Sequence, residues 1–284
     1  KIPTASILAF APPGKAKVNA GVLLLDTDTD RLHVRMRRDW DWIAEQAFLP
    51  RAQFDGDFAT ITNVRAFDHC PSGGPPVRLW ETRTVDLSRI ESVWFALSLF
   101  EESWRGPAHS FISFGFADST FLAVSVEARK EKGEIYSPLR GMAKRFELCF
   151  VIADEEDVLK LRAVCRDDRV YLYPLRVDPE KARELLVEML ESANELARSP
   201  KFYNTLWNNC TTVIIDRANA VATKRIPGGL HSFLPGYSDK VLHSLGLIEG
   251  EGSIGEIRER YLVNGVARRY ADDPRFSVMV RRQP

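Results

Sequence analysis

Residues 203–222, YNTLWNNCTTVIIDRANAVA, decide which fold this chain is expected to adopt. Two asparagines precede Cys210 and two threonines follow it. Apolar residues then recur at helical spacing, at Val213, Ile214, Ile215, Ala218 and Val221. Because asparagine and threonine favour the first positions of helices, the stretch predicts a buried helix that begins at Cys210.

Cys210 has two interpretations at this position. A helix N-terminus carries partial positive charge and unpaired N–H groups, which stabilise a thiolate and so favour a nucleophile. The alternative is a small apolar residue that fills a gap in the core, because free cysteines are often buried. The local sequence leaves both interpretations open.

The other three cysteines lack a comparable setting. Cys149 lies within the strand-like run RFELCFVI, Cys165 ends a predicted helix, and Cys70 lies in the loop CPSGGPP. No CxxC spacing occurs, so neither a zinc site nor another metal or cofactor is expected. Disulfides would be allowed, but a chain of this length does not need them to fold.

The overall charge argues against several classes of partner. The 284 residues contain 39 Lys and Arg against 39 Asp and Glu, so the net charge is zero and nothing global attracts nucleic acid. The fingerprints GxGxxG and GxxxxGK[ST] are absent, which disfavours nucleotide partners. The sequence leaves the oligomeric state open.

The first residue, Lys1, indicates a fragment or a processed form. No apolar run approaches the roughly 20 residues that span a bilayer. We therefore expect any targeting or membrane segment to lie upstream of this sequence.

Hydrophobic periodicity predicts alternating strands and helices before Cys210. Strands are expected at 58–67, 78–87, 109–116, 120–130, 145–153 and 169–177, and helices at 88–102, 155–165 and 178–199. Asp86 or Ser88 is expected to cap the first helix, and Asp154 the second. The four acids that open the second helix are interpreted as capping and solvated residues.

These elements predict one α+β domain over residues 1–284, with an antiparallel sheet packed against the helix that carries Cys210 at its N-terminus. Residues 1–57 are expected to form an N-terminal extension, 58–222 the core, and 223–284 a C-terminal extension with a short helix near 241–248. His231 and His243 in that extension are interpreted as structural or solvated residues.

The strands 109–116 and 120–130 predict a hairpin with a three-residue turn. The residue numbers of cross-strand partners then add up to 236. His109 and Glu127 are therefore expected to be partners on neighbouring strands, with both side chains on the same face of the sheet. A carboxylate that orients a histidine is the condition for a general base. The alternative is that His109 merely begins a surface strand, and a slip of one residue would separate the pair.

A thiol site can be assembled from these residues. Cys210 would be the nucleophile, His109 the base and Glu127 the residue that orients the base. The backbone N–H of Cys210 would be one oxyanion donor, with Asn208, Asn209 or Tyr203 as the second.

Five segments together resemble the N-terminal periplasmic domain of Lnb-type bacterial lipoprotein acyltransferases: HSFISFGF, VSVEARKEKGE, FVIADEEDVLKLR, VYLYPL and YNTLWNNCTT. The resemblance covers most of residues 35–240. It implies a circularly permuted papain-like fold, similar to lecithin retinol acyltransferase and NlpC-type thiol enzymes. It also implies Cys210 as nucleophile, His109 as base, and a location outside the cytoplasmic membrane with a membrane tether beyond these residues.

Family members with an assigned activity move an acyl chain within a diacylglyceryl lipoprotein to its N-terminal amine. We therefore expect cysteine-dependent acyl transfer or hydrolysis on a lipid or lipoprotein at the membrane surface. The alternatives are an NlpC-type peptidase or amidase acting on cell-wall peptide, and a non-catalytic periplasmic binding domain. An apolar groove beside Cys210 would favour lipid, and a polar open cleft would favour peptide.

Overall fold

The computed structural model describes residues 23–26, 31–34, 41–101, 104–143, 145–229, 232 and 234–282. The chain divides into two compact units, residues 1–41 and 42–284. In the first unit, β1 (Leu23–Asp26) and β2 (Arg31–Val34) form an antiparallel hairpin. The second unit contains the elements described below.

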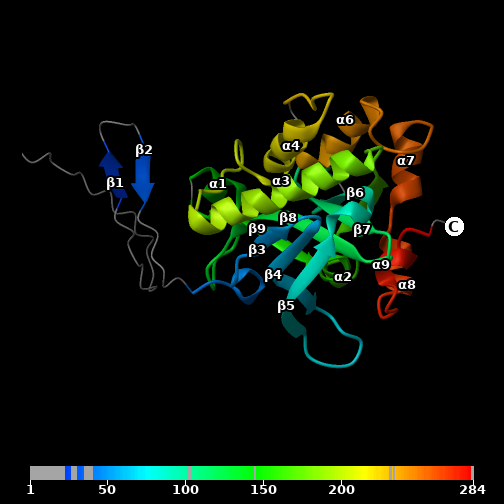
Figure 1. Cartoon of the computed structure of the whole chain (residues 1–284), viewed down its shortest axis with the longest axis horizontal. Helices are drawn as coiled ribbons and strands as arrows, with labels where there is room; N and C mark the ends of the chain where they lie inside the picture. The colour runs from blue at the N-terminus through cyan, green and yellow to red at the C-terminus, as the bar shows by residue number, and fades with distance from the viewer. Residues whose placement is uncertain are drawn as a thin grey trace, which may run out of the picture. The chain divides into compact units, whose positions relative to one another are not determined.

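The second unit is of the α+β class and is built on an eight-stranded sheet (Figure 1). The strand order is β10-β6-β7-β8-β9-β4-β3, and β5 pairs with β4. The strands are β3 (Arg51–Asp55), β4 (Phe58–Asp68), β5 (Val77–Asp86), β6 (Ile90–Leu99), β7 (Ala108–Phe116), β8 (Phe121–Arg129), β9 (Glu147–Asp154) and β10 (Arg169–Pro174). Only the contact between β4 and β9 is parallel within this sheet of the described chain. This open, mostly antiparallel sheet is compatible with a papain-like fold.

Helices cover the two faces of the sheet (Figure 1). The long helices α3 (Pro179–Arg198) and α4 (Cys210–Val221) pack on one face, with α6 (Ser238–Ser244) beside them. The other face is covered by α2 (Glu155–Lys160), the π-helix η3 (Leu161–Cys165), α8 (Asn264–Arg269) and α9 (Phe276–Met279). The remaining short helices are η1 (Ala44–Gln46), η2 (Leu87–Arg89), α1 (Pro138–Met142), η4 (Pro235–Tyr237) and α7 (Ile254–Tyr261).

The predicted hairpin is confirmed, and its register is the expected one. Phe111 pairs with Ser125 and Ile112 with Val124, so paired positions sum to 236. Alternation along β7 places Ile112 in the core beneath α3 and α4, and Phe111 in the core of the opposite face. His109 therefore shares the face of Phe111 and of Ser125.

The predicted amphipathic helix over residues 88–102 is wrong, because this stretch is strand β6. Phe95 and Leu97 are buried on one face of the sheet and Ala96 on the other. A strand buried on both faces lacks the alternation of a half-exposed strand, so its apolar spacing can imitate a helix. Asp86 does act as a cap, but for the single turn η2, where it accepts a hydrogen bond from Ser88 N.

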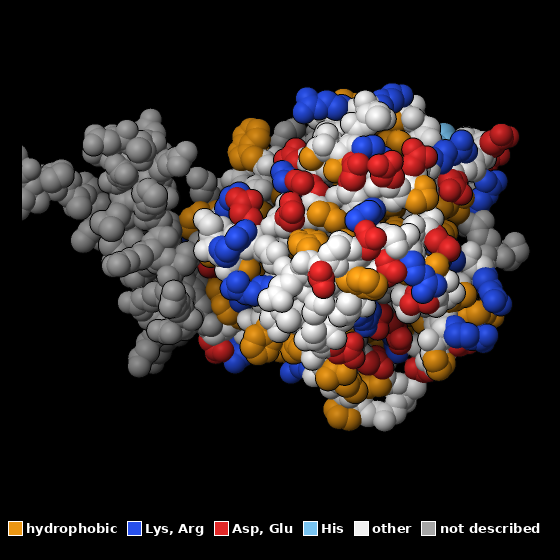
Figure 2. Space-filling view, viewed as in Figure 1, with side chains coloured by type: hydrophobic (Ala, Val, Ile, Leu, Met, Phe, Trp, Pro, Cys, Tyr) orange, Lys and Arg blue, Asp and Glu red, His pale blue; other side chains and the backbone are white. Residues whose placement is uncertain are grey.

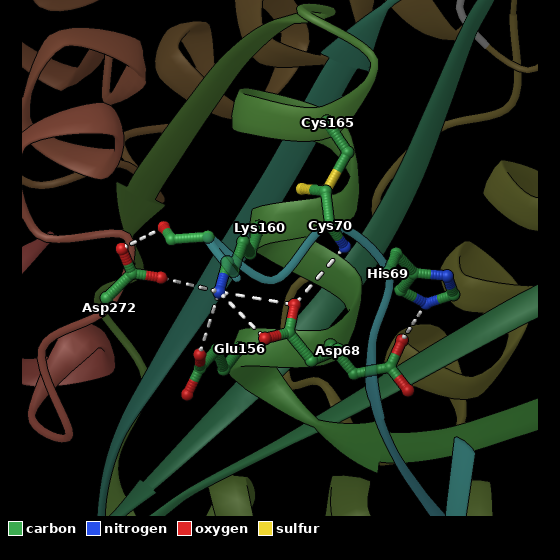
Figure 3. The surroundings of a disulfide bond; sticks show 9 residues. Asp68, His69, Cys70, Glu156, Lys160, Cys165 and Asp272 are labelled. Carbon is green, nitrogen blue, oxygen red and sulfur yellow. Dashed lines mark hydrogen bonds and ion pairs between the residues drawn. A yellow bond between two sulfur atoms is a disulfide. The ribbon is translucent and has the colours of Figure 1, made fainter. Parts of the chain in front are cut away.

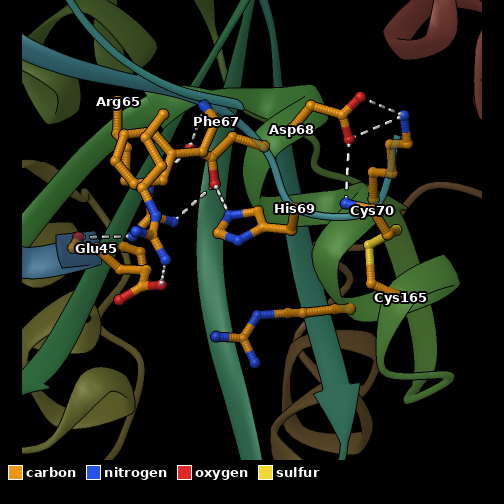
Figure 4. A network of polar contacts seen from close by, with 12 residues as sticks. Glu45, Arg65, Phe67, Asp68, His69, Cys70 and Cys165 are labelled. Carbon is orange, nitrogen blue, oxygen red and sulfur yellow. Dashed lines mark hydrogen bonds and ion pairs between the residues drawn. A yellow bond between two sulfur atoms is a disulfide. The ribbon is translucent and has the colours of Figure 1, made fainter. Parts of the chain in front are cut away.

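The acids at the start of α2 are not solvated as expected. Asp154 occupies the N-cap position without a side-chain capping bond. Glu155 and Asp157 are buried, and they pair with Arg281 and Arg65 respectively. Figure 4 shows Arg65 and His69 within this polar network, in which both contact Asp157 at 2.8 and 2.9 Å. Buried charges require such partners, since an unpaired one would lose its hydration without compensation.

A disulfide joins Cys70, in the loop between β4 and β5, to Cys165 at the end of η3 (Figure 3). The sequence did not predict this pairing. Beside it, the Lys160 amine lies within 3.2 Å of Asp68 and 3.6 Å of Asp272. Cys149 is a free, buried residue of β9, as expected.

The C-terminal residues contribute to the core of the second unit. Val263, Ala267, Phe276 and Val280 join the apolar cluster on the α2 face. The domain boundaries at residues 57 and 222 stay predictions. His243 Nε2 donates a hydrogen bond to Gly252 O at 3.1 Å, whereas His231 lies outside the described residues.

The surface view in Figure 2 shows Lys and Arg interspersed with Asp and Glu over the visible face of the second unit. Within the described parts of the chain, no helix has both the length and the apolar character needed to cross a membrane.

Candidate functional site

Cys210 is the first residue of α4, which confirms the predicted helix start. Asn209 Oδ1 accepts hydrogen bonds from Thr211 N and Thr212 N, both at 2.9 Å. Thr212 Oγ1 in turn accepts from Asn209 N at 2.8 Å, which completes a capping box. The cap uses the N–H groups that follow Cys210 and leaves the N–H of Cys210 itself for another acceptor.

The two predicted asparagine donors are occupied by structural bonds. Asn209 Nδ2 donates to Thr205 O and Ser232 O, each at 2.8 Å. Asn208 Nδ2 donates to Phe202 O at 2.9 Å. Both amides therefore hold the turn that precedes α4, and Tyr203 is the predicted donor that shares a cavity with Cys210.

This cavity has a volume of about 440 Å³ and lies at the end of β7 and β8. Its lining includes Cys210, Tyr203, His109 and Glu127, so these four predicted residues line one cavity. The cavity also holds Arg162, which the sequence did not single out.

His109 contacts Glu127 through Ser125. The distance from His109 Nε2 to Ser125 Oγ is 2.8 Å, and Ser125 Oγ donates to Glu127 Oε1 at 3.1 Å. Since the serine hydroxyl has one proton, it accepts from an Nε2–H group of His109. The Nδ1 atom then carries the lone pair that a general base requires. The direct distance between His109 Nε2 and Glu127 Oε1 is 4.0 Å.

Burial controls the ionisation of this pair. It lowers the pKa of His109 to about 3, with a further contribution from the positive charge of Arg162. Burial raises the pKa of Glu127, but the charges of Arg65, His109 and Arg162 and a 2.7 Å hydrogen bond from Gln46 outweigh it and lower that pKa to about 2. At neutral pH the site therefore contains a neutral imidazole and an ionised carboxylate.

Cys210 and His109 line one cavity but are not hydrogen-bonded to each other in the described structure. Cys210 Sγ contacts Thr211 Oγ1 at 3.8 Å. Thr211 Oγ1 lies 3.0 Å from Ser110 Oγ, so α4 packs on the face of β7 opposite to His109. The cavity connects the two side chains around the start of β7, where Ala108 also lines it.

Tyr203 also lines the Cys210 cavity. Burial raises the pKa of its hydroxyl, and the negative charges of Cys210 and of Tyr136 raise it further. The hydroxyl lies 3.4 Å from that of Tyr136. It remains protonated at neutral pH.

Two residues that the sequence did not predict belong to this site. Ser125 stands two positions before Glu127 on the same face of β8, so strand alternation alone could have placed it beside His109. Arg162 comes from η3, and no local pattern places that segment against β7 and β8.

A second cavity, of about 180 Å³, is lined by residues of α4 from its second residue to its last. Thr211 lines its near end, followed along the helix by Ile214, Ile215 and Ala218. Leu242 and Leu247 also line it. The first residue of α4, Cys210, therefore lines a cavity with charged walls, and the second, Thr211, lines a cavity with mostly apolar walls. Among the described residues, no group of three or more His, Cys, Asp and Glu side chains is placed to hold a metal ion.

The fold and the cavity define an α+β domain with a helix-start cysteine next to a mostly antiparallel sheet. The chain belongs to the family of the Lnb N-terminal periplasmic domain, whose family model matches residues 78–231, more than half of the chain. The match includes His109, Glu127, Tyr203 and Cys210. No curated protein and no solved structure matches the chain. Membership of this family supports a location outside the cytoplasm.

Proposed function

We propose that this domain catalyses cysteine-dependent acyl transfer or hydrolysis through an acyl-thioester on Cys210. One observation carries the proposal: Cys210, at the start of α4, and His109, oriented by Ser125 and Glu127, line the same cavity. A nucleophile with an oriented base is the arrangement that covalent catalysis requires.

In the first half-reaction, Cys210 Sγ bonds to the acyl carbonyl carbon, and its proton passes to Nδ1 of His109. Because the two groups are not in contact before substrate binds, the proton crosses through one water molecule or after the base approaches. The oxyanion accepts hydrogen bonds from Cys210 N–H and from the Tyr203 hydroxyl. The bond to the leaving group then breaks, and the leaving group takes the proton from His109.

In the second half-reaction, an amine or a water molecule attacks the thioester carbonyl. His109 accepts the proton of the attacking group, and the released Cys210 sulfur recovers it. An amine yields acyl transfer, whereas water yields hydrolysis.

Two features support a lipid or lipoprotein substrate at the membrane surface. The apolar cavity begins at Thr211, one residue from the nucleophile, and is lined by aliphatic side chains of α4. Ile135 and Trp207 are 77% and 70% exposed, on loops that meet near the cavity through Tyr136 and Tyr203. Exposed apolar side chains of this kind mark interaction surfaces. Attachment of the protein to the membrane is part of the same proposal.

The decisive experiment is mass spectrometry of the protein after incubation with a bacterial lipid extract. We expect an acyl adduct that is released by hydroxylamine, is absent from Cys210→Ala, and is retained in the matched control Cys149→Ala. An adduct that persists on Cys210→Ala protein would show that the nucleophile is another residue.

The charged lining of the Cys210 cavity favours a second candidate, a peptidase or amidase acting on cell-wall peptide. Four cationic and two anionic side chains line it: Arg65, Lys130, Arg162, Arg166, Glu45 and Glu127. Incubation with purified cell-wall peptides separates the two functions, because cleavage that depends on Cys210 without lipid acylation would identify a peptidase. A protein that forms no adduct and cleaves nothing would be a binding domain.

A further inference from the structure

Arg162 is a buried arginine whose hydrogen-bonding capacity is unused. Its exposed fraction is 6%, and its Nε atom is buried without a hydrogen-bond partner. The nearest carboxylate oxygens, of Glu127 and Asp168, lie 3.9 and 3.8 Å from the guanidinium nitrogens, which is too far for hydrogen bonds. None of its five N–H donors therefore has an acceptor within the described structure.

The other two buried arginines of the described chain show the contrast. Arg65 donates to Asp157 through Nε and Nη2 at 2.8 Å, and to Glu45 O at 2.9 Å. Arg129 donates to Gln46 O and Ala47 O, both at 3.0 Å, and to Glu147 at 3.3 Å. A buried donor without an acceptor is costly, so the unpaired Nε of Arg162, in a guanidinium that forms only long ion pairs and no hydrogen bond, indicates that the cavity can supply an acceptor of its own.

Arg166 adds a second positive charge to the same cavity. It is exposed, and among the described residues its side chain has no ion-pair partner. Burial lowers the pKa of Arg162 to about 10, and the nearby charge of Arg166 opposes protonation further. Glu127 and Asp168 compensate part of the charge of Arg162, whereas Arg166 adds a second positive charge without such a partner among the described residues, so a further anion would be stabilised beside the two guanidinium groups.

The backbone that carries both arginines is held in place. Arg162 lies within the π-helix η3, a conformation that is rare and concentrated at functional sites. The disulfide fixes Cys165, directly before Arg166, to the β4–β5 loop. Both guanidinium groups are thus presented from a segment with a fixed end.

We infer that Arg162 and Arg166 form a binding site for a phosphate group within the Cys210 cavity. Two guanidinium groups can donate hydrogen bonds to three or more oxygens of a tetrahedral phosphate. A carboxylate has only two oxygens, and a single bidentate guanidinium is enough to bind both. The cavity volume of about 440 Å³ leaves room for the rest of a phosphorylated molecule. Together with the proposed function, on which this step rests, the site makes a phosphate-bearing acyl compound the substrate.

The test uses isothermal titration calorimetry on Cys210→Ala protein, so that binding is measured without turnover and independently of the proposed chemistry. Inorganic phosphate is the first probe. Monomeric dihexanoylphosphatidylglycerol and dihexanoylglycerol, which differ by the phosphate-containing headgroup, are the second and third. The arginine variants are Arg166→Ala, Arg162→Gln and Arg162→Lys, with the exposed Arg169→Ala as matched control.

We expect phosphate to bind and the affinity to fall at least tenfold in Arg166→Ala, while Arg169→Ala binds like the parent protein. Arg162→Gln should abolish binding and Arg162→Lys should restore part of it. Phosphatidylglycerol that binds much more tightly than inorganic phosphate identifies a lipid headgroup as the source, whereas equal affinities identify a free or soluble phosphate. In either case dihexanoylglycerol should not bind.

Two results would overturn the site. One is that neither phosphate compound binds the folded parent protein, which would mean that water alone satisfies Arg162. The other is that Arg169→Ala loses as much affinity as Arg166→Ala, which would mean that binding follows the overall charge. Because Arg166 is exposed, its variant gives an answer even if Arg162→Gln does not fold.

Discussion

At the scale of single residues, the site depends on a histidine that burial keeps neutral. His109 is 8% exposed, and its pKa lies at about 3 instead of the ordinary 6.5. The folded protein therefore binds fewer protons than the unfolded chain between these two values. Above pH 6.5 the imidazole is neutral in both states, so its burial does not make the unfolding free energy depend on pH. As the pH falls from 6.5 towards 3, the unfolded chain takes up a proton that the folded protein does not, and the folded protein loses stability.

His109→Gln should make the pH dependence of stability shallower. As the pH falls from 6.5 to 4.5, we expect the parent protein to lose unfolding free energy through this residue with a slope that rises towards about 1.4 kcal/mol per pH unit, and the variant to lose little. Glu127, whose pKa is lowered to about 2 from 4.5, contributes mainly below this window. Urea unfolding across the pH range measures the slope, with His243→Gln as control, and equal slopes for all three proteins would contradict the prediction.

Ser125 is expected to act as a positioning residue, since its hydroxyl is the link between His109 and Glu127. Ser125→Ala should slow formation of the acyl-thioester by about 10- to 100-fold, less than the roughly 100- to 10,000-fold that a general base contributes, because the base loses its orientation but is still present. The pH profile of that rate should also shift, because the imidazole loses the bond that selects its tautomer. Ser125→Thr keeps the hydroxyl and should restore the rate. A slow Ser125→Thr protein with an unchanged pH profile would point to a packing defect instead.

At the scale of elements, the sequence predicted correctly those features that depend on neighbouring residues alone. The hairpin of β7 and β8 and the start of α4 followed from turn length, strand alternation and capping residues. Strand β6 could not be recognised, because both of its faces are covered by helices that come later in the chain. The pairing of Asp157 with Arg65 and of Cys70 with Cys165 joins segments more than ninety positions apart, and spacing carries no information about such contacts.

The disulfide should be a major contribution to stability, because it closes a long loop. Its cysteines are separated by 95 positions. A cross-link of this span removes enough freedom from the unfolded chain to contribute about 4.7 kcal/mol in the chain-entropy model. Replacing both residues, as Cys70→Ala with Cys165→Ala, should lower the urea midpoint, and reductant should lower that of the parent protein by a similar amount. Equal midpoints for parent and double variant would show that the cross-link contributes nothing.

At the scale of the whole molecule, the C-terminal helices complete the second face of the sheet. Phe276 is 1% exposed and packs with Ala267 and Val280 in the cluster that contains Val158 and Leu159 of α2. Arg281 pairs with the fully buried Glu155, so the charge of α2 is also compensated from this end of the chain. The sequence showed only a charged terminus, because the apolar residues of these short helices are few and widely spaced.

This packing predicts that the C-terminal segment cannot be removed from the folded domain. Phe276→Ala should lower the unfolding free energy by about 3 to 5 kcal/mol, because it leaves a cavity among residues that no solvent reaches. Phe276→Leu, which retains most of the apolar volume, should cost about 1 kcal/mol. A chain that ends at residue 222 should expose the α2 face and the buried carboxylate of Glu155 together, and should not unfold cooperatively in urea. A cooperative transition in that shortened chain, at the midpoint of the parent protein, would instead establish residues 223–284 as a separable extension.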